Sequence, residues 1–153
     1  MTTAPRIGSA FLLAQIGAHA ASRFAERISE LDLTPPQTGL LRAVAAEPGR
    51  SQQSLARHLG TPASRLVALV DGLAGRGLVE RRRNPDDRRL HALHVTPAGK
   101  EMLDRIGGVA GEHEQDLLGA LDPDERATLR ELLSRVADDQ GLTPGVHPGY
   151  RRL

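Results

Sequence analysis

The chain has 153 residues, of which 39% are hydrophobic and 25% are charged, and its formal net charge is +1. These values are typical of a soluble globular protein, and the length suits a single domain with its own core. The absence of cysteine excludes disulfides, thiolate metal sites, cysteine nucleophiles and thiol-based redox sensing. The amino terminus has no signal-peptide pattern, and no apolar run approaches the roughly 20 residues of a membrane-spanning helix. We therefore expect a cytoplasmic protein that does not contact a membrane.

Charge is distributed unevenly along the chain although its total is close to zero. Residues 50–97 hold nine arginines against four acidic residues, whereas residues 98–153 hold seven basic against eleven acidic residues. Residues 1–49 are balanced. The local excess of arginine predicts that the middle of the chain faces a polyanion.

The first third of the chain is predicted to form two helices. Apolar residues at steps of three and four indicate one long amphipathic helix over residues 10–31. Thr34-Pro35-Pro36-Gln37 then combines an N-cap, a first-turn proline and a capping box. These signals predict a second helix that runs to about Glu47.

Two short helices follow, separated by one tight turn. Ser51 caps the first of them, which ends at Gly60 in a position suited to a left-handed conformation. Thr61-Pro62 restarts a helix at once, and an apolar stripe continues through Leu73 before the glycines at 75 and 77. Two short helices joined by a glycine-containing turn form a helix-turn-helix.

After Gly77 the helical period changes to that of strands. Residues 78–83 and 90–96 are predicted strands, joined by Asn84-Pro85-Asp86-Asp87, a cluster of turn-forming residues. Thr96-Pro97 and Asp122-Pro123 each start a further helix, and beyond Gly141 we expect a loose tail. The predicted fold class is mainly α with a small β-wing.

The run from Thr34 to Gly99 resembles the winged helix-turn-helix core of the MarR family of bacterial transcriptional regulators. The matching motifs are Ser51-Gln52-Gln53-Ser54-Leu55-Ala56, the pattern L-x-x-x-G-L-V-E-R at residues 73–81, and a wing pattern with D-x-R at residues 87–89 and T-x-x-G at residues 96–99. The resemblance implies a single domain over residues 1–153 that assembles as a homodimer. Its DNA-binding module would span residues 34–99, its dimerisation helices residues 8–32 and 97–140, and its flexible tail residues 141–153.

The second short helix holds the candidate base reader, Arg65. Because Leu66 and the apolar residues after it form the buried stripe, Thr61, Ser64 and Arg65 are expected on the opposite face. An arginine near the start of a recognition helix can donate two hydrogen bonds to O6 and N7 of guanine, and a serine beside it can contact a base or a phosphate. The alternative is that Arg65 is simply solvated.

Phosphate contacts are expected at the start of the first short helix and on the wing. Arg50, Ser51 and Gln52 lie at a helix N-terminus, which favours an anion, although ordinary capping also explains them. On the hairpin the DNA-binding candidates are Arg83, Asp87, Arg88 and Arg89. By the resemblance, Arg89 enters the minor groove and Asp87 holds the loop in shape. The alternative is an arginine-rich hairpin that only protects a sheet edge against aggregation.

The resemblance also implies a pocket for a small aromatic or apolar effector between the dimerisation helices and the DNA-binding module. The candidate lining residues are Ile16, His19, Phe24, Leu40, Met102 and Ile106. The six histidines raise the alternative of a zinc-responsive regulator, but their spacing does not match a metal site, so we expect no metal and no cofactor. No nucleophile elbow, phosphate loop or dinucleotide motif is present, so we expect no enzyme.

The sequence therefore predicts a DNA-binding transcriptional regulator, specifically a ligand-responsive repressor that acts as a dimer on a pseudo-palindromic double-stranded operator. Two other functions stay open at this point. One is a helical dimeric module that binds a ligand or a protein and no longer binds DNA. The other is a zinc-responsive regulator of the same fold.

Overall fold

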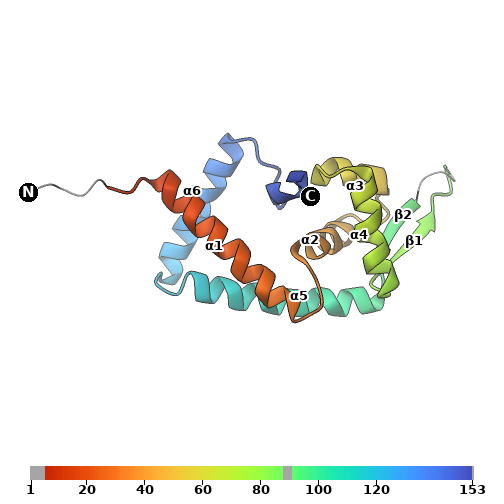
Figure 1. Ribbon diagram of the computed structural model, residues 1–153, viewed down its shortest axis with the longest axis horizontal. Coiled ribbons are helices and arrows are strands. Elements are labelled where there is room, and N and C mark those ends of the chain that lie inside the picture. Colours follow the sequence, from red (N-terminus) through yellow and green to blue (C-terminus); the bar gives the residue numbers. More distant parts are fainter. Residues whose placement is uncertain (1–5, 88–90, 153) are drawn as a thin grey trace, which may run out of the picture.

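The computed structural model describes residues 6–87 and 91–152, and it is an elongated molecule with two parts (Figure 1). A compact module at one end contains α2 (Pro35–Ala46), α3 (Gln52–Leu59), α4 (Ala63–Gly75) and a hairpin of β1 (Val79–Arg83) and β2 (His91–Val95). The other end contains α6 (Pro123–Asp139) and the start of α1 (Ser9–Ser29), and α5 (Pro97–Leu117) runs between the two ends. The short 3-10 helix η1 (Pro148–Arg152) follows α6. This architecture confirms the predicted fold class.

Side-chain caps start α2, α3, α5 and α6 where the sequence predicted them. The Thr34 hydroxyl accepts a hydrogen bond from the Gln37 N–H (3.4 Å), and the Gln37 side chain accepts one from the Thr34 N–H (3.0 Å), so the capping box is complete. Ser51 and Thr96 cap α3 and α5, and Asp122 caps α6. None of the described helices has both the length and the apolar character needed to cross a membrane.

The hairpin is joined to the start of α3. β1 and β2 pair antiparallel, with Val79 opposite Val95 and Arg83 opposite His91. On its other side β2 bonds to the segment before α3, because the Gly49 N–H donates to the Leu93 carbonyl (2.9 Å) and the Leu93 N–H donates to the Arg50 carbonyl (3.1 Å). The N-terminus of α3 therefore has a fixed position relative to the wing.

The hydrophobic core lies inside the α2–α4 module and continues along the first half of α5. Its fully buried large side chains come from α1 to α5 and from β2: Ile28, Leu40, Leu41, Val44, Leu55, Leu66, Val70, Leu73, Leu93 and Ile106. Gly99 lets α5 approach the chain before β1, since a Cβ at this position would lie 2.1 Å from the Leu78 carbonyl oxygen. The T-x-x-G motif thus combines the cap of α5 with a close backbone contact.

Apolar side chains remain exposed at the end of the molecule away from the wing. No described residue of α6 is buried, and Leu132, Leu133 and Val136 on this helix are 40–49% exposed. On α1 the exposed apolar residues are Phe11, Leu12, Leu13 and Ile16. Large apolar side chains gathered on two helices are typical of an interaction surface.

The expectation of a loose tail over residues 141–153 is wrong for the described part of that segment. The chain turns back after α6 through Gly141 (φ 67°) and Gly145 (φ 71°), and η1 returns toward the α2–α4 module (Figure 1). There Tyr150 is 5% exposed and belongs to the core. No periodic pattern predicts this contact, because the only buried side chain among residues 141–150 is a single aromatic one.

Candidate nucleic-acid interface

Helix α4 presents the predicted base-reading residues to solvent. Leu66, Val70 and Leu73 are buried against the core, and Ser64 and Arg65 are exposed on the outer face. The Arg65 side chain has no hydrogen bond or ion pair with any described residue. Its guanidinium is therefore available to an external acceptor, as the sequence predicted.

Thr61 does not share this face. It is 7% exposed, and its Oγ1 is buried without a hydrogen-bond partner among the described residues. The reason lies in the end of α3, where the Thr61 N–H donates to the Ala56 carbonyl (3.1 Å) after the left-handed Gly60. In this type of helix ending the residue after the left-handed position packs back onto the helix. The predicted groove-facing role of Thr61 is therefore wrong, and Pro62, which makes no side-chain cap, precedes α4.

The residues at the start of α3 are partly engaged inside the molecule. Ser51 accepts a hydrogen bond from the Ser54 N–H (3.1 Å). The Arg50 Nε donates to the Ser54 hydroxyl (2.7 Å), and its Nη1 lies 3.5 Å from a Glu47 oxygen. These contacts hold the Arg50 guanidinium beside the positive end of the α3 dipole, where a phosphate would be attracted.

Arg81 connects three elements of the interface and was not among the predicted contact residues. From β1 its Nε donates to the Gln52 side-chain oxygen on α3 (2.7 Å), and its Nη2 donates to Asp71 on α4 (2.5 Å). Nη2 also lies 3.5 Å from the Val67 carbonyl oxygen. Arg81 thus braces α3, α4 and the wing against one another and orients Gln52. Strand alternation was the available signal, because Arg81 follows the buried Val79 by two residues and shares its face.

The wing carries further cations toward its tip. Arg83 ends β1, is exposed, and has no ion pair with a described residue, whereas Arg82 is paired with Glu80 on its own strand. The Asn84 side chain accepts a hydrogen bond from the Asp86 N–H (3.0 Å) and shapes the turn. Asp87 is half-buried. The predicted contact residues Arg88 and Arg89 lie outside the described residues.

The six predicted pocket residues fall into two groups. Leu40, Met102 and Ile106 are buried in the core, each at most 8% exposed. Ile16 and His19 lie on the exposed side of α1, and Phe24 is half-buried with its ring centroid 5.6 Å from that of His113. Phe24 also packs partly against the core, whereas Ile16 and His19 do not belong to it, so the pocket assignment stays a prediction.

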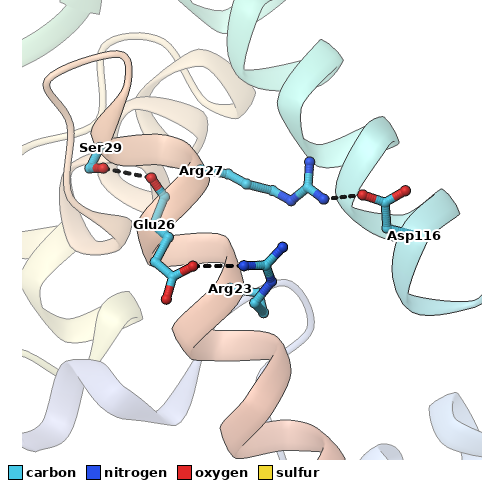
Figure 2. A network of polar contacts seen from close by, with 5 residues as sticks. All are labelled: Arg23, Glu26, Arg27, Ser29 and Asp116. Atoms are coloured by element: carbon cyan, nitrogen blue, oxygen red, sulfur yellow. Dashed lines mark hydrogen bonds and ion pairs between the residues drawn. The ribbon is translucent and has the colours of Figure 1, made fainter.

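A polar bridge joins α1 and α5 next to these residues. Arg27 extends from α1 to Asp116 on α5, while Arg23 pairs with Glu26 along α1 (2.9 Å) (Figure 2). Arg27 and Asp116 also border a hollow of about 490 Å³ along α5. Burial lowers the pKa of His113, and Arg27 and Arg23 lower it further, so His113 is neutral at physiological pH. Within the described residues no group of three or more His, Asp or Glu side chains could hold a metal ion.

Comparison with known sequences identifies the class of the molecule. The sequence profile of the MarR family matches residues 31–90. A protein of Thauera aromatica named "Putative transcriptional regulatory protein for hcr operon" is 37% identical over 123 residues, which cover 80% of this chain and 74% of that protein. The relatives are named as regulators, in agreement with the expectation that the chain is no enzyme.

Solved structures share the fold over most of their length. Wild-type MarR from E. coli in its apo form superposes with a TM-score of 0.78 at 27% identity, and the match covers 87% of this chain and 98% of that protein. The transcriptional repressor CouR bound to a 23-mer DNA duplex gives a TM-score of 0.75 at 34% identity, with 85% of this chain and 92% of CouR covered.

Proposed function

Because the chain belongs to the MarR family of winged-helix transcriptional regulators, we propose that it is a ligand-responsive repressor that binds a pseudo-palindromic operator as a homodimer. The observation that carries the proposal is the exposed Arg65 side chain on α4, which has no partner among the described residues and belongs to a module whose α3, α4 and wing are joined by Arg81. The similarity to CouR, whose structure contains a DNA duplex, supports a DNA-binding role for the same module here.

In this proposal the two classes of contact come from different elements. Arg65 and Ser64 enter the major groove, where the arginine fork can donate to both acceptors of a guanine. The start of α3 and Arg83 contact phosphates, which fix the position of the module without reading sequence. Arg89 enters the minor groove, where a narrow A·T-rich segment concentrates negative potential.

The homodimer is supported by the apolar residues exposed on α1 and α6. In a single chain these side chains are 40–59% exposed. Covering them in a dimer would contribute about 25 cal/mol of stabilising free energy for each Å² of apolar surface that is buried. A two-fold assembly through these helices repeats the α4 and wing surfaces, so the operator should contain two related half-sites.

The effector is proposed to be a small aromatic or apolar molecule bound where α1, α2 and α5 meet. Phe24 and His113 offer ring surfaces there, and the ion pair between Arg27 and Asp116 lies beside them. An effector can release DNA only if it binds the free conformation of the dimer more tightly than the bound one. A change in the spacing of the two α4 helices would meet this condition.

The experiment that tests the function is selection of bound duplexes from a random pool, followed by titration of the selected duplex at several salt concentrations. We expect an enriched motif with two half-sites and a steep fall of affinity with salt, because phosphate contacts release counterions. No binding to any duplex at low salt would instead favour the helical module that binds a ligand or a protein.

A further inference from the structure

The segment after α6 places one aromatic side chain on α2. The Tyr150 hydroxyl donates a hydrogen bond to the Pro36 carbonyl oxygen (2.6 Å), and the residue is 5% exposed. A Cβ at Gly39 would lie 2.0 Å from that hydroxyl oxygen and 3.0 Å from the ring carbon that bears it. The phenol therefore fills a notch that exists only because residue 39 is glycine. We call the surface formed by Pro36 and Gly39 the α2 notch.

We propose that the α2 notch is a binding site for a para-substituted phenol and that Tyr150 of this chain is its resident ligand. The site has the two features such a ligand needs, an apolar space for the ring and a carbonyl acceptor for the hydroxyl proton. Burial raises the pKa of Tyr150 to about 12, so the phenol is neutral at physiological pH and keeps the proton that it donates. A phenolate has no proton to donate to the Pro36 carbonyl and would be excluded.

The attachment of the segment depends on few side chains. Its backbone is folded locally, with hydrogen bonds from the Val146 N–H to the Thr143 carbonyl (3.1 Å) and from the Tyr150 N–H to the His147 carbonyl (3.3 Å). Val146 packs partly against the core, but Leu142 is 46% exposed. A segment with so few buried contacts can detach without unfolding the module, which leaves the notch open to a free phenol.

Occupancy of the α2 notch would be transmitted to the recognition helix through Pro36. This residue also lines a cleft of about 520 Å³ between the start of α2 and α4, together with Thr34, Gln37, Ser64, Arg65, Ala68 and Leu69. Pro36, whose carbonyl accepts the Tyr150 hydrogen bond, thus also lines the cleft that Arg65 borders. This consequence rests on the proposed DNA-binding function, whereas the notch itself does not.

The first test uses the fact that Tyr150 is the only tyrosine and that the chain has no tryptophan. Tyrosine fluorescence of the full chain at neutral pH should resist quenching by acrylamide, compared with the same chain in denaturant. Gly39→Ala should make quenching several-fold stronger, and Leu142→Ala in the same segment should leave it unchanged. Quenching of the native chain as strong as that of the unfolded chain would overturn the proposal.

The second test compares the melting temperatures of the full chain, Gly39→Ala, Tyr150→Ala and the variant with both substitutions. Gly39→Ala should lower the melting temperature of the full chain, because the new Cβ meets the phenol. In the Tyr150→Ala background, Gly39→Ala should raise the melting temperature, because the phenol is gone and alanine has a higher helix propensity than glycine. An equal effect of Gly39→Ala in both backgrounds would show that Tyr150 does not fill the notch.

The third test adds a free phenol, p-cresol, to the variant in which the notch is vacant. The melting temperature of Tyr150→Ala should rise with p-cresol concentration, whereas that of Tyr150→Ala with Gly39→Ala should not. No rise in either variant, or the same rise in both, would overturn the assignment of a phenol site. Titration of Tyr150→Ala with operator DNA tests separately whether occupancy of the α2 notch affects α4. A several-fold change in affinity supports this coupling, and an unchanged affinity refutes it. The assignment of the notch itself is decided by the fluorescence and melting experiments.

Discussion

At the scale of single residues, two arginines beside α4 have different tasks. The Arg65 guanidinium has no partner among the described residues, while the Arg81 guanidinium is bonded to α3 and α4 at once. A free cation at the surface can serve an external ligand, and a cation with internal partners sets geometry. Substitution of each arginine should therefore affect DNA binding in a different way.

Arg65→Lys and Arg65→Ala separate the charge of this residue from its shape. Arg65→Ala should cost about 1 to 3 kcal/mol on the selected operator and much less on a random duplex, since a bidentate base contact is lost. Arg65→Lys should recover little, because lysine keeps the charge but lacks the planar fork. Titrations of both duplexes measure this. If the two duplexes weaken equally in Arg65→Ala, the residue contacts a phosphate and sequence is read elsewhere.

For Arg81 we expect coupling with Gln52. Arg81→Ala should weaken operator binding without removing a direct contact to DNA, because α3, α4 and the wing lose their common brace. In a double-mutant cycle, the loss of binding free energy in the variant with both Arg81→Ala and Gln52→Ala should differ from the sum of the two single losses by about 0.5 to 3 kcal/mol, because the two residues belong to one network. Strictly additive losses would show that the two side chains act independently.

At the scale of elements, local signals decide where each helix begins and ends. The capping box of α2 and the caps of α3, α5 and α6 lie where residue types alone predicted them. Contacts between elements then depend on how closely their backbones approach. Gly99 is the clearest case, since its position against the Leu78 carbonyl leaves no room for a side chain.

Gly99→Ala and Gly107→Ala form a matched pair on α5. A Cβ at Gly99 meets backbone, so Gly99→Ala should destabilise the protein by about 1 to 3 kcal/mol, the range for overpacked sites. A Cβ at Gly107 meets no atom within 4 Å, and alanine is favoured there by roughly 1 kcal/mol on helix propensity. Chemical denaturation of the two variants measures the difference. Equal stabilities would contradict the close contact between α5 and Leu78.

At the scale of the whole molecule, α1 and α6 expose apolar side chains in a single chain, which supports the proposed dimer. The core of the α2–α4 module is closed, while α6 contributes no buried residue among those described. The apolar side chains of these two helices can be covered by a second copy of the chain, and the proposed operator symmetry depends on that assembly.

The dimer is tested by placing a charge on α6. Leu132→Glu should shift the purified protein from dimer to monomer, because a carboxylate would be buried at the interface. Leu132 is 49% exposed in one chain, so the monomer should keep its helical content in circular dichroism. Sedimentation equilibrium at micromolar concentration reports the masses. A stable monomer formed by the unsubstituted chain would remove the basis for a two-fold operator.

The sequence by itself determined the order of helices α1 to α6, the hairpin and the exposed position of Ser64 and Arg65, because caps, turns and periodicity act between residues close in the chain. Tertiary structure decided the rest of the candidate site. The burial of Thr61 follows from the way α3 ends, the brace at Arg81 joins residues up to 29 positions apart, and Tyr150 bonds to a carbonyl 114 positions away. No local pattern encodes such pairs, since their partners meet only after the elements have packed.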